Sequence, residues 1–449
     1  MAFTISRVLI KLKYICFLAL MINQTVLGQN TVQEFSFDSY EEIWNQVKAK
    51  NPDLESYRLN IDKANYDVKA SKAFRLPTVT GTFNGQRNFD LATTPLPGEI
   101  AGQPGNTVDV QFGQDFAYNA GISINKSFLD RQSALKLKMS KLNAEMATAQ
   151  QAAFLELLDQ QTGLYYYSAL VAKRAVQLWE QDLQLSDSVA TIILNRYEEG
   201  LIDAISANQA RINVLTVQQN LNNNQQLYQQ SIDELRKLLG CLPEDKLELN
   251  ESLQYELPKV FSSERLTSNQ DIALASINKD QAQTQVSIQK SLFIPQLSLN
   301  TYLGRQQFRN DFGLSFDGDE WSNYSYASLN LNIPIFSGLS KINQLKSSKL
   351  DLERAKNDLQ TEINKAMIED NRLINDYHLS LRNTKLTKDA YELYEENSLL
   401  SYQQYEEGLI SLDRYLTVFQ DYLKSENTFL NSLLNNYNYY SQIAPRILN

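Results

Sequence analysis

The residue types that perform enzyme or metal chemistry are scarce in this chain of 449 residues. His378, the single histidine, stands in an expected helix next to Tyr377 and is predicted to be a surface or packing residue. Cys241 has no nearby histidine in the sequence to activate its thiol. Such a small supply of ligands argues against most metal cages and against a disulfide framework.

Carboxylates and phosphate-binding loops give no catalytic pattern either. The pair Glu198-Glu199 falls in a predicted turn, where exposure to solvent accounts for both side chains. Neither common glycine-rich phosphate loop occurs in the sequence. The sequence therefore predicts a protein that is not an enzyme, with no catalytic residue, no cofactor and no metal site.

The charge balance excludes further classes of function. The chain has 42 basic and 52 acidic side chains, a formal charge of −10. Residues 1–28 hold three of the basic residues and no acid, so the remainder has 39 basic against 52 acidic residues, or −13. A nucleic-acid partner is not expected, because binding phosphates requires clustered Lys and Arg.

The N-terminal segment has the pattern of a signal peptide. Basic residues precede an apolar run at 14–22, and Val26-Leu27-Gly28 is suited to signal peptidase. Nine apolar residues are too few for a transmembrane helix, which needs about 20. Residues 1–28 are therefore predicted to direct export and to be removed.

An internal duplication is the most informative feature of the sequence. The segment Tyr197-Glu198-Glu199-Gly200-Leu201-Ile202 recurs without change as Tyr405-Glu406-Glu407-Gly408-Leu409-Ile410. Other matches follow the same order at similar offsets, including Leu76-Pro77 with Ile294-Pro295. We predict a first repeat at 29–240, a linker or equatorial segment at 241–263, and a second repeat at 264–449.

Each repeat is expected to contain the same elements in the same order. A helix ends before a proline, a short alternating strand and a loop follow, and a second strand leads into a very long helix, a turn and a return helix. The predicted ranges are helices 37–75 and 264–292, strands at 79–83 and 297–303, loops 91–115 and 307–323, second strands 118–127 and 324–335, and long helices 131–196 and 339–404.

The long helices carry apolar residues at intervals of seven. In the first repeat these are Leu157, Leu164, Val171, Leu178, Leu185 and Ile192. A helix of about 65 residues would be about 100 Å long. Such length with a seven-residue repeat predicts coiled-coil packing rather than a globular core.

The repeated segment itself is predicted to form the tip of a helical hairpin. Gly200 and Gly408 suit the left-handed conformation that ends a helix, and Asp203 and Ser411 suit the N-caps of the return helices. A turn alone does not require the apolar Leu-Ile pair that both tips share. We therefore predict that both pairs are exposed and form a contact site.

The four short strands alternate in a way that suits a membrane. Ile122 and Ile124 alternate with Ser123 and Asn125, as expected of strands with an apolar outer face and a polar inner face. Aromatic residues stand near the expected strand ends, namely Phe112, Phe116, Tyr118, Phe312, Trp321, Tyr324 and Tyr326. Four strands are too few to close a barrel, which needs about eight, so several chains must share one.

A duplicated arrangement of this kind behind a signal peptide resembles the TolC-type outer membrane efflux family over about 36–440. The segment from Ile333 to Gly338 is close to the family pattern at the second strand-to-helix passage, whereas 126–131 lacks the matching proline and glycine. The resemblance implies a mainly α fold with a membrane β-barrel. It implies a homotrimer in which each chain adds four strands to one 12-stranded barrel, and its paired helices to a periplasmic coiled-coil tunnel.

The same resemblance implies an outer membrane channel of a tripartite efflux or type I secretion system. Its partners would be outer membrane lipid, a periplasmic adaptor (membrane fusion) protein and an inner-membrane transporter. The positions that would contact the adaptor are Tyr197, Glu198, Glu199, Gly200, Leu201 and Ile202 with Tyr405, Glu406, Glu407, Gly408, Leu409 and Ile410.

The resemblance also places candidates for the pore constriction after the second tip. The family often has carboxylates six and nine residues beyond the tip glycine, where this chain has Arg414 and Thr417, with Asp413 one residue earlier. A different class of protein also fits the long helices, namely a soluble periplasmic coiled-coil scaffold or adaptor. The four strands and their aromatic flanks favour the channel, because a scaffold would not need them.

Overall fold

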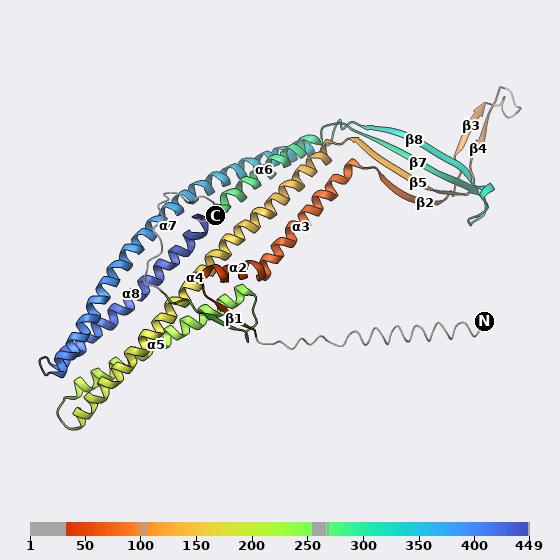
Figure 1. Ribbon diagram of the computed structural model, residues 1–449. Helices are drawn as coiled ribbons and strands as arrows, with labels where there is room; N and C mark the ends of the chain where they lie inside the picture. Colours follow the sequence, from red (N-terminus) through yellow and green to blue (C-terminus); the bar gives the residue numbers. More distant parts are fainter. Residues whose placement is uncertain are drawn as a thin grey trace, which may run out of the picture. The chain divides into compact units, whose positions relative to one another are not determined.

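The computed structural model describes residues 33–97, 99, 102, 105–253, 266 and 269–447 (Figure 1). The predicted signal peptide 1–28 and the last part of the predicted linker lie outside the described residues. The chain forms two compact units. Unit 1 comprises the described residues of Met1–Asn51, Gln161–Pro258 and Ser380–Asn438, and unit 2 those of Pro52–Gln160, Lys259–Leu379 and Tyr439–Asn449. Each unit takes segments from both predicted repeats, whose boundaries stay a prediction.

Two helical hairpins make up most of unit 1. The first pairs the end of α4 (Arg131–Glu198) with α5 (Ala204–Leu239), and the second pairs the end of α7 (Ser340–Glu406) with α8 (Leu412–Ile447). The long helices have 68 and 67 residues, which confirms the prediction of two very long helices that end at the repeated tips. Within the described residues, no helix is both long enough and apolar enough to span a membrane.

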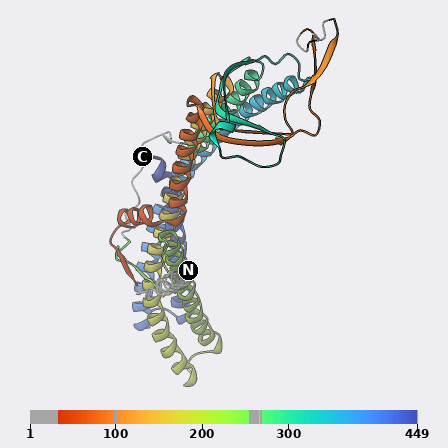
Figure 2. The same ribbon diagram turned by 90° about the vertical axis from the view of Figure 1, so that its right-hand side faces the viewer.

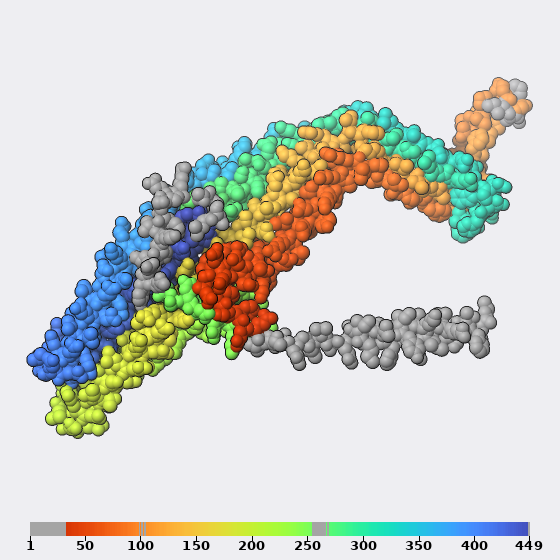
Figure 3. Space-filling model, in the orientation of Figure 1, coloured from red at the N-terminus to blue at the C-terminus, as the bar shows by residue number. Residues whose placement is uncertain are grey.

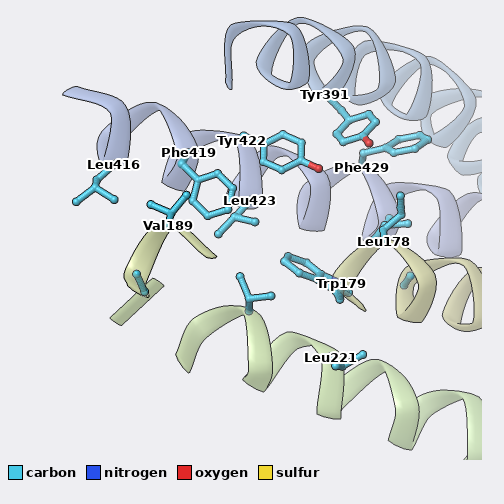
Figure 4. Close-up of a cluster of buried hydrophobic side chains, with 14 of the residues drawn as sticks. Leu178, Trp179, Val189, Leu221, Tyr391, Leu416, Phe419, Tyr422, Leu423 and Phe429 are labelled. Atoms are coloured by element: carbon cyan, nitrogen blue, oxygen red, sulfur yellow. The ribbon is translucent and has the colours of Figure 1, made fainter. Parts of the chain in front are cut away.

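The core of unit 1 lies between the two hairpins (Figure 4). Trp179 from α4 and Phe419 from α8 are almost completely buried, and Leu221 from α5 and Tyr391 from α7 belong to the same cluster. The rings of Tyr391 and Phe429 stack with their centroids 5.6 Å apart. The apolar positions predicted from the seven-residue spacing are divided: Val171 and Leu178 are buried in this core, whereas Leu157, Leu185 and Ile192 are exposed.

A small parallel sheet completes unit 1. Strand β1 (Glu34–Phe37) pairs with β6 (Lys246–Leu249), and α2 (Tyr40–Lys50) follows β1. The Ser39 hydroxyl caps α2 by accepting a hydrogen bond from the Glu42 amide at 3.4 Å. The sequence analysis did not predict this sheet.

The first predicted helix, at 37–75, is wrong as a single element. It is divided into α2 and α3 (Pro52–Lys72), which belong to different units, and the short η1 (Ala73–Arg75) follows. Asn51, between them, has extended backbone angles, as the residue before a proline prefers. Pro52 then occupies the first position of α3, where its missing N–H is not needed. The matching helix in the second repeat is α6 (Gln270–Ser291), close to the predicted 264–292.

Four antiparallel strands form the main sheet of unit 2 (Figure 2). They are β2 (Thr78–Arg87), β5 (Phe116–Leu129), β7 (Gln296–Arg309) and β8 (Ser322–Asn332), in the order β2-β5-β7-β8. The predicted strands are confirmed, although each is longer or begins earlier than expected. The region 91–115, predicted as a loop, also contains a hairpin of β3 (Thr93–Pro97) and β4 (Thr107–Gln111), and η2 (Gly318–Glu320) precedes β8.

The register separates an apolar face of this sheet from a polar one. Val79 lies opposite Ile124, Ile122 opposite Leu303, and Leu299 opposite Leu329, so these side chains share one face. Thr80 opposite Ser123 and Asn125 opposite Asn300 lie on the other face. The predicted alternation is confirmed for these residues, although Lys126 and Thr301 also lie on the apolar face, and Tyr302 and Tyr326 on the polar face.

Candidate docking surface at the helical tips

The two tips have the same backbone geometry. In the first, the Gly200 amide donates to the Tyr197 carbonyl at 2.9 Å and the Leu201 amide to the Arg196 carbonyl at 2.9 Å. In the second, the Gly408 amide donates to the Tyr405 carbonyl at 3.0 Å and the Leu409 amide to the Gln404 carbonyl at 2.8 Å. Gly200 and Gly408 have φ values of 71° and 73°, which confirms the predicted left-handed helix ends.

The predicted N-caps are also present. Asp203 Oδ1 accepts hydrogen bonds from the backbone amides of Ile205 at 2.7 Å and Ser206 at 2.9 Å. These bonds, led by that from Ser206, hold the pKa of Asp203 below its usual value, because they stabilise the carboxylate. At the second tip, Ser411 Oγ accepts from the Arg414 amide at 3.3 Å. The return helices thus begin where the sequence predicts.

The leucines of the tips are exposed, but the isoleucines are not. Leu201 and Leu409 are 71% and 69% exposed. Ile202 and Ile410 are partly buried against the core of unit 1, so the prediction that both Leu-Ile pairs are exposed is wrong for the isoleucines. The isoleucines anchor each turn to the helices, which leaves the leucine of each pair exposed; at the first tip Ile205 is exposed as well, at 81%. The space-filling view shows the two tips side by side, the first in yellow-green and the second in blue (Figure 3).

The tyrosines of the repeated segment have different surroundings at the two tips. Tyr197 is exposed, whereas Tyr405 is partly buried and stacks on Tyr415 with ring centroids 5.7 Å apart. Arg196 Nη1 donates a hydrogen bond to the Tyr405 hydroxyl at 2.9 Å. The identical sequences therefore form two surfaces that differ in their side chains.

Two further hydrogen bonds join the hairpins behind the tips. Ser206 Oγ donates to Asp413 Oδ1 at 3.1 Å, and Gln420 Nε2 donates to Asn213 Oδ1 at 2.8 Å. The sequence analysis identified none of Arg196, Ser206, Asn213 or Gln420. The available signal was weak: Arg196 precedes the first repeated segment, where Gln404 precedes the second.

The predicted constriction residues lie together at the start of α8. Asp413, Arg414 and Thr417 are all exposed, and Thr417 Oγ1 donates to the Asp413 carbonyl at 2.8 Å. The Asp413 carboxylate, the only one among the three residues, also accepts the hydrogen bond from Ser206 described above. Their role in a pore stays a prediction.

Four glutamates lie within three residues of the exposed leucines in the sequence. Glu198, Glu199, Glu406 and Glu407 are all exposed, and the described residues provide no ion-pair partner for any of them. Tyr402 donates a hydrogen bond to Glu406 Oε1 at 2.9 Å, and this bond raises the pKa of Tyr402. The tips therefore present exposed apolar side chains and exposed carboxylates close together in the sequence. Across the described part of the chain, no group of three or more His, Cys, Asp and Glu side chains is placed to hold a metal ion.

Comparison with known proteins identifies the family. The family model for outer membrane efflux proteins matches residues 43–241 and 261–440, which together cover most of the chain. The chain belongs to the outer membrane efflux protein family. This family is one of channels of the outer membrane, and the long helices of unit 1 are of the kind that forms its periplasmic tunnel.

Individual relatives share the fold at low sequence identity. Outer membrane protein TolC of Vibrio cholerae is 23% identical over 331 residues, which are 72% of this chain and 70% of that protein. The CmeC outer membrane channel of Campylobacter jejuni has a TM-score of 0.74 at 17% identity, over 91% of this chain and 85% of CmeC. The MtrE outer membrane channel of Neisseria gonorrhoeae has a TM-score of 0.68 at 16% identity, over 91% of this chain and 88% of MtrE. The predicted fold class of the TolC-type channels is thereby confirmed.

Proposed function

We propose that this outer membrane efflux protein acts as a homotrimer, as the passive outer membrane channel of a tripartite efflux or type I secretion system. An inner-membrane transporter would supply the energy, and a periplasmic adaptor would contact the tips. The observation that carries the proposal is the four-stranded sheet of unit 2, whose apolar face is open. Val79, Phe83, Ile122, Leu303, Leu329 and Leu331 are each between 47% and 65% exposed.

An exposed apolar face on a four-stranded sheet suits contact with lipid. In lipid, the two edges of the sheet would need strands from further copies of the chain. Among the described strands, β2 and β8 are the two edges of the sheet, and each has a strand partner on one side only. In hydrocarbon every backbone N–H and C=O must be paired, because no water is available to replace a missing hydrogen bond. Pairing β8 of one copy with β2 of the next satisfies both edges at once.

The number of copies follows from the size of the channel. Two chains would provide about eight strands, and the interior of such a barrel is filled by side chains. Three chains provide twelve strands, which leave room for water within a polar inner face. A trimer is therefore the smallest assembly of this sheet that can conduct a solute.

The geometry of the tips supports the contact with an adaptor. Leu201 and Leu409 are exposed on short turns, where stability alone does not require a leucine. An apolar side chain on each tip, with glutamates around it, provides a small hydrophobic centre and a polar rim, the usual composition of a protein interface. A conduit of this kind requires no catalysis, so the chain is proposed not to be an enzyme.

Fractionation and mass measurement test this proposal. The protein is expected in the outer membrane fraction, and its mass in detergent should be three times that of the mature chain. The alternative, a soluble periplasmic scaffold or adaptor, predicts recovery from the periplasm without detergent. A soluble protein, or a folded monomer stable in detergent, would contradict the channel.

A further inference from the structure

Two carboxyl groups lie buried in the core of unit 1, where they join the two hairpins. Asp182 on α4 is 6% exposed, and Glu426 on α8 is fully buried, at 0%. The Tyr422 hydroxyl donates a hydrogen bond to Asp182 Oδ1 at 3.2 Å. Burial of two ionised carboxylates side by side would be very costly, because they repel each other in a medium of low polarity.

In the part of the chain that the structure describes, no cation compensates these carboxyl groups. Among the described residues, neither Asp182 nor Glu426 forms an ion pair with Lys, Arg or His. The titratable groups that face the pair are acids as well: Glu395 and Tyr391 on α7, and Tyr422 and Tyr415 on α8. Helix α5 contributes apolar residues such as Leu221 to this core (Figure 4). The pair can therefore be neutralised only by a proton.

The surroundings of the carboxyl oxygens lead to the same conclusion. Both carboxyl oxygens of Glu426, and Oδ2 of Asp182, are buried and have no hydrogen-bond partner among the described residues. An ionised carboxylate with neither a hydrogen bond nor a cation is very costly to bury, so Glu426 must carry a proton. We propose that Asp182 and Glu426 form a proton-binding site that holds the first hairpin to the second, with the proton on Glu426.

The direction of the pKa shifts agrees with this assignment. Burial is the largest cause for both groups, and the neighbouring Asp182 raises the pKa of Glu426 further, to about 9. A buried acid with a raised pKa holds a proton that the unfolded chain releases. Its contribution is favourable in acid and is lost as the pH rises from 4.5, the ordinary pKa of Glu, to about 9. The contact between the hairpins should therefore weaken at alkaline pH.

Infrared spectroscopy of the purified protein in detergent tests the proton directly. A difference spectrum between neutral and alkaline pH should show the carbonyl stretch of one protonated carboxyl group that is lost as the pH rises. The band should vanish in Glu426→Gln, whose amide has nearly the same shape but cannot titrate. Asp421→Asn, which changes an exposed carboxylate on the same helix, should retain the band. Absence of the band in the wild type, or its persistence in Glu426→Gln, would overturn the proposal.

Hydrogen exchange tests the effect on the hairpins. As the pH rises, the protection of backbone amides around 182 and 426 from exchange should fall relative to the same amides in Glu426→Gln. The fall should be up to about tenfold per pH unit, as expected for the loss of one proton. Asp421→Asn should behave like the wild type. Equal pH dependence in the wild type and Glu426→Gln would show that the site does not join the hairpins. Both readouts are independent of efflux, so their failure is distinguishable from failure of the proposed function.

Discussion

Arg196 and Tyr405 join the two tips, since Arg196 Nη1 donates to the Tyr405 hydroxyl at 2.9 Å and its guanidinium carbon lies 5.7 Å from the ring centroid. The second tip cannot make the equivalent contact with the first, because Gln404 takes the place of Arg196 in the second repeat. The backbone turn is therefore the same at both tips, but this side-chain contact is made by the first tip alone.

Removing this contact should loosen both tips without unfolding the chain. Arg196→Ala is expected to lower the free energy of local opening by about 1 kcal/mol or less, because the Arg196 side chain is exposed to solvent. Tyr405→Phe should remove the hydrogen bond yet retain the stacking on Tyr415. Hydrogen exchange of the tip amides in both single variants and the double variant measures the coupling. Strictly additive effects would mean that the hydrogen bond contributes nothing.

Close packing within the sheet gives a second prediction. A Cβ atom on Gly121 would lie 2.7 Å from the Leu303 carbonyl oxygen and 2.7 Å from the Tyr302 ring, which covers this glycine. Gly121→Ala is therefore expected to destabilise the assembled protein by about 1–3 kcal/mol, since the backbone of β7 cannot move away cheaply.

A matched glycine provides the control. A Cβ atom on Gly81, in the neighbouring strand β2, would have no heavy atom within 4 Å. Gly81→Ala should leave the stability unchanged or raise it slightly, because alanine restricts the unfolded chain. Thermal unfolding of both variants in detergent makes the comparison, and equal behaviour would show that the Tyr302 ring moves aside freely.

The sequence predicts features whose causes are local. Gly200 and Asp203 act on the backbone within a few residues of themselves, so the tip could be predicted in detail. The long helices could be predicted because an apolar residue every seven positions repeats over many turns. The strands of the main sheet were predicted from alternation, which depends only on each strand's own residues.

Features that depend on distant residues could not be predicted. The four-residue strands β1 and β6 pair across more than 200 positions, and neither is long enough to show a period. The burial of Ile202 depends on helices from both halves of the chain. The same is true of the Asp182–Glu426 pair, because either carboxylate alone resembles an ordinary charged helical residue.

Reversal of charge at Arg414 should reveal whether it lines the pore. In a trimer, three copies of this exposed residue would form a ring, and a ring of like charges strongly affects the local concentration of ions. Arg414→Glu is expected to shift the selectivity of the channel towards cations in planar bilayers. Arg414→Lys retains the charge and should leave selectivity unchanged. If Arg414→Glu also has no effect, the constriction lies elsewhere.

The exposed leucines allow the role of the tips to be tested apart from assembly. Leu201 and Leu409 have most of their surface free, so Leu201→Asp combined with Leu409→Asp should not affect folding, trimer formation or membrane insertion. Efflux should nevertheless fail, because an unpaired carboxylate buried in an apolar contact costs several kcal/mol, which is enough to break a modest interface. The surrounding glutamates add to this cost by repelling the new charges.

Drug resistance of cells that carry the double variant at wild-type protein levels is the measurement. The matched control is Leu201→Met with Leu409→Met, which keeps an apolar side chain of similar size at each tip and should retain efflux. Loss of resistance in the aspartate variant, with an intact trimer in the outer membrane, would place the failure at the contact with the adaptor. If the aspartate variant instead exports normally, the two leucines make no contact that matters, and the repeated segments serve only to reverse the chain.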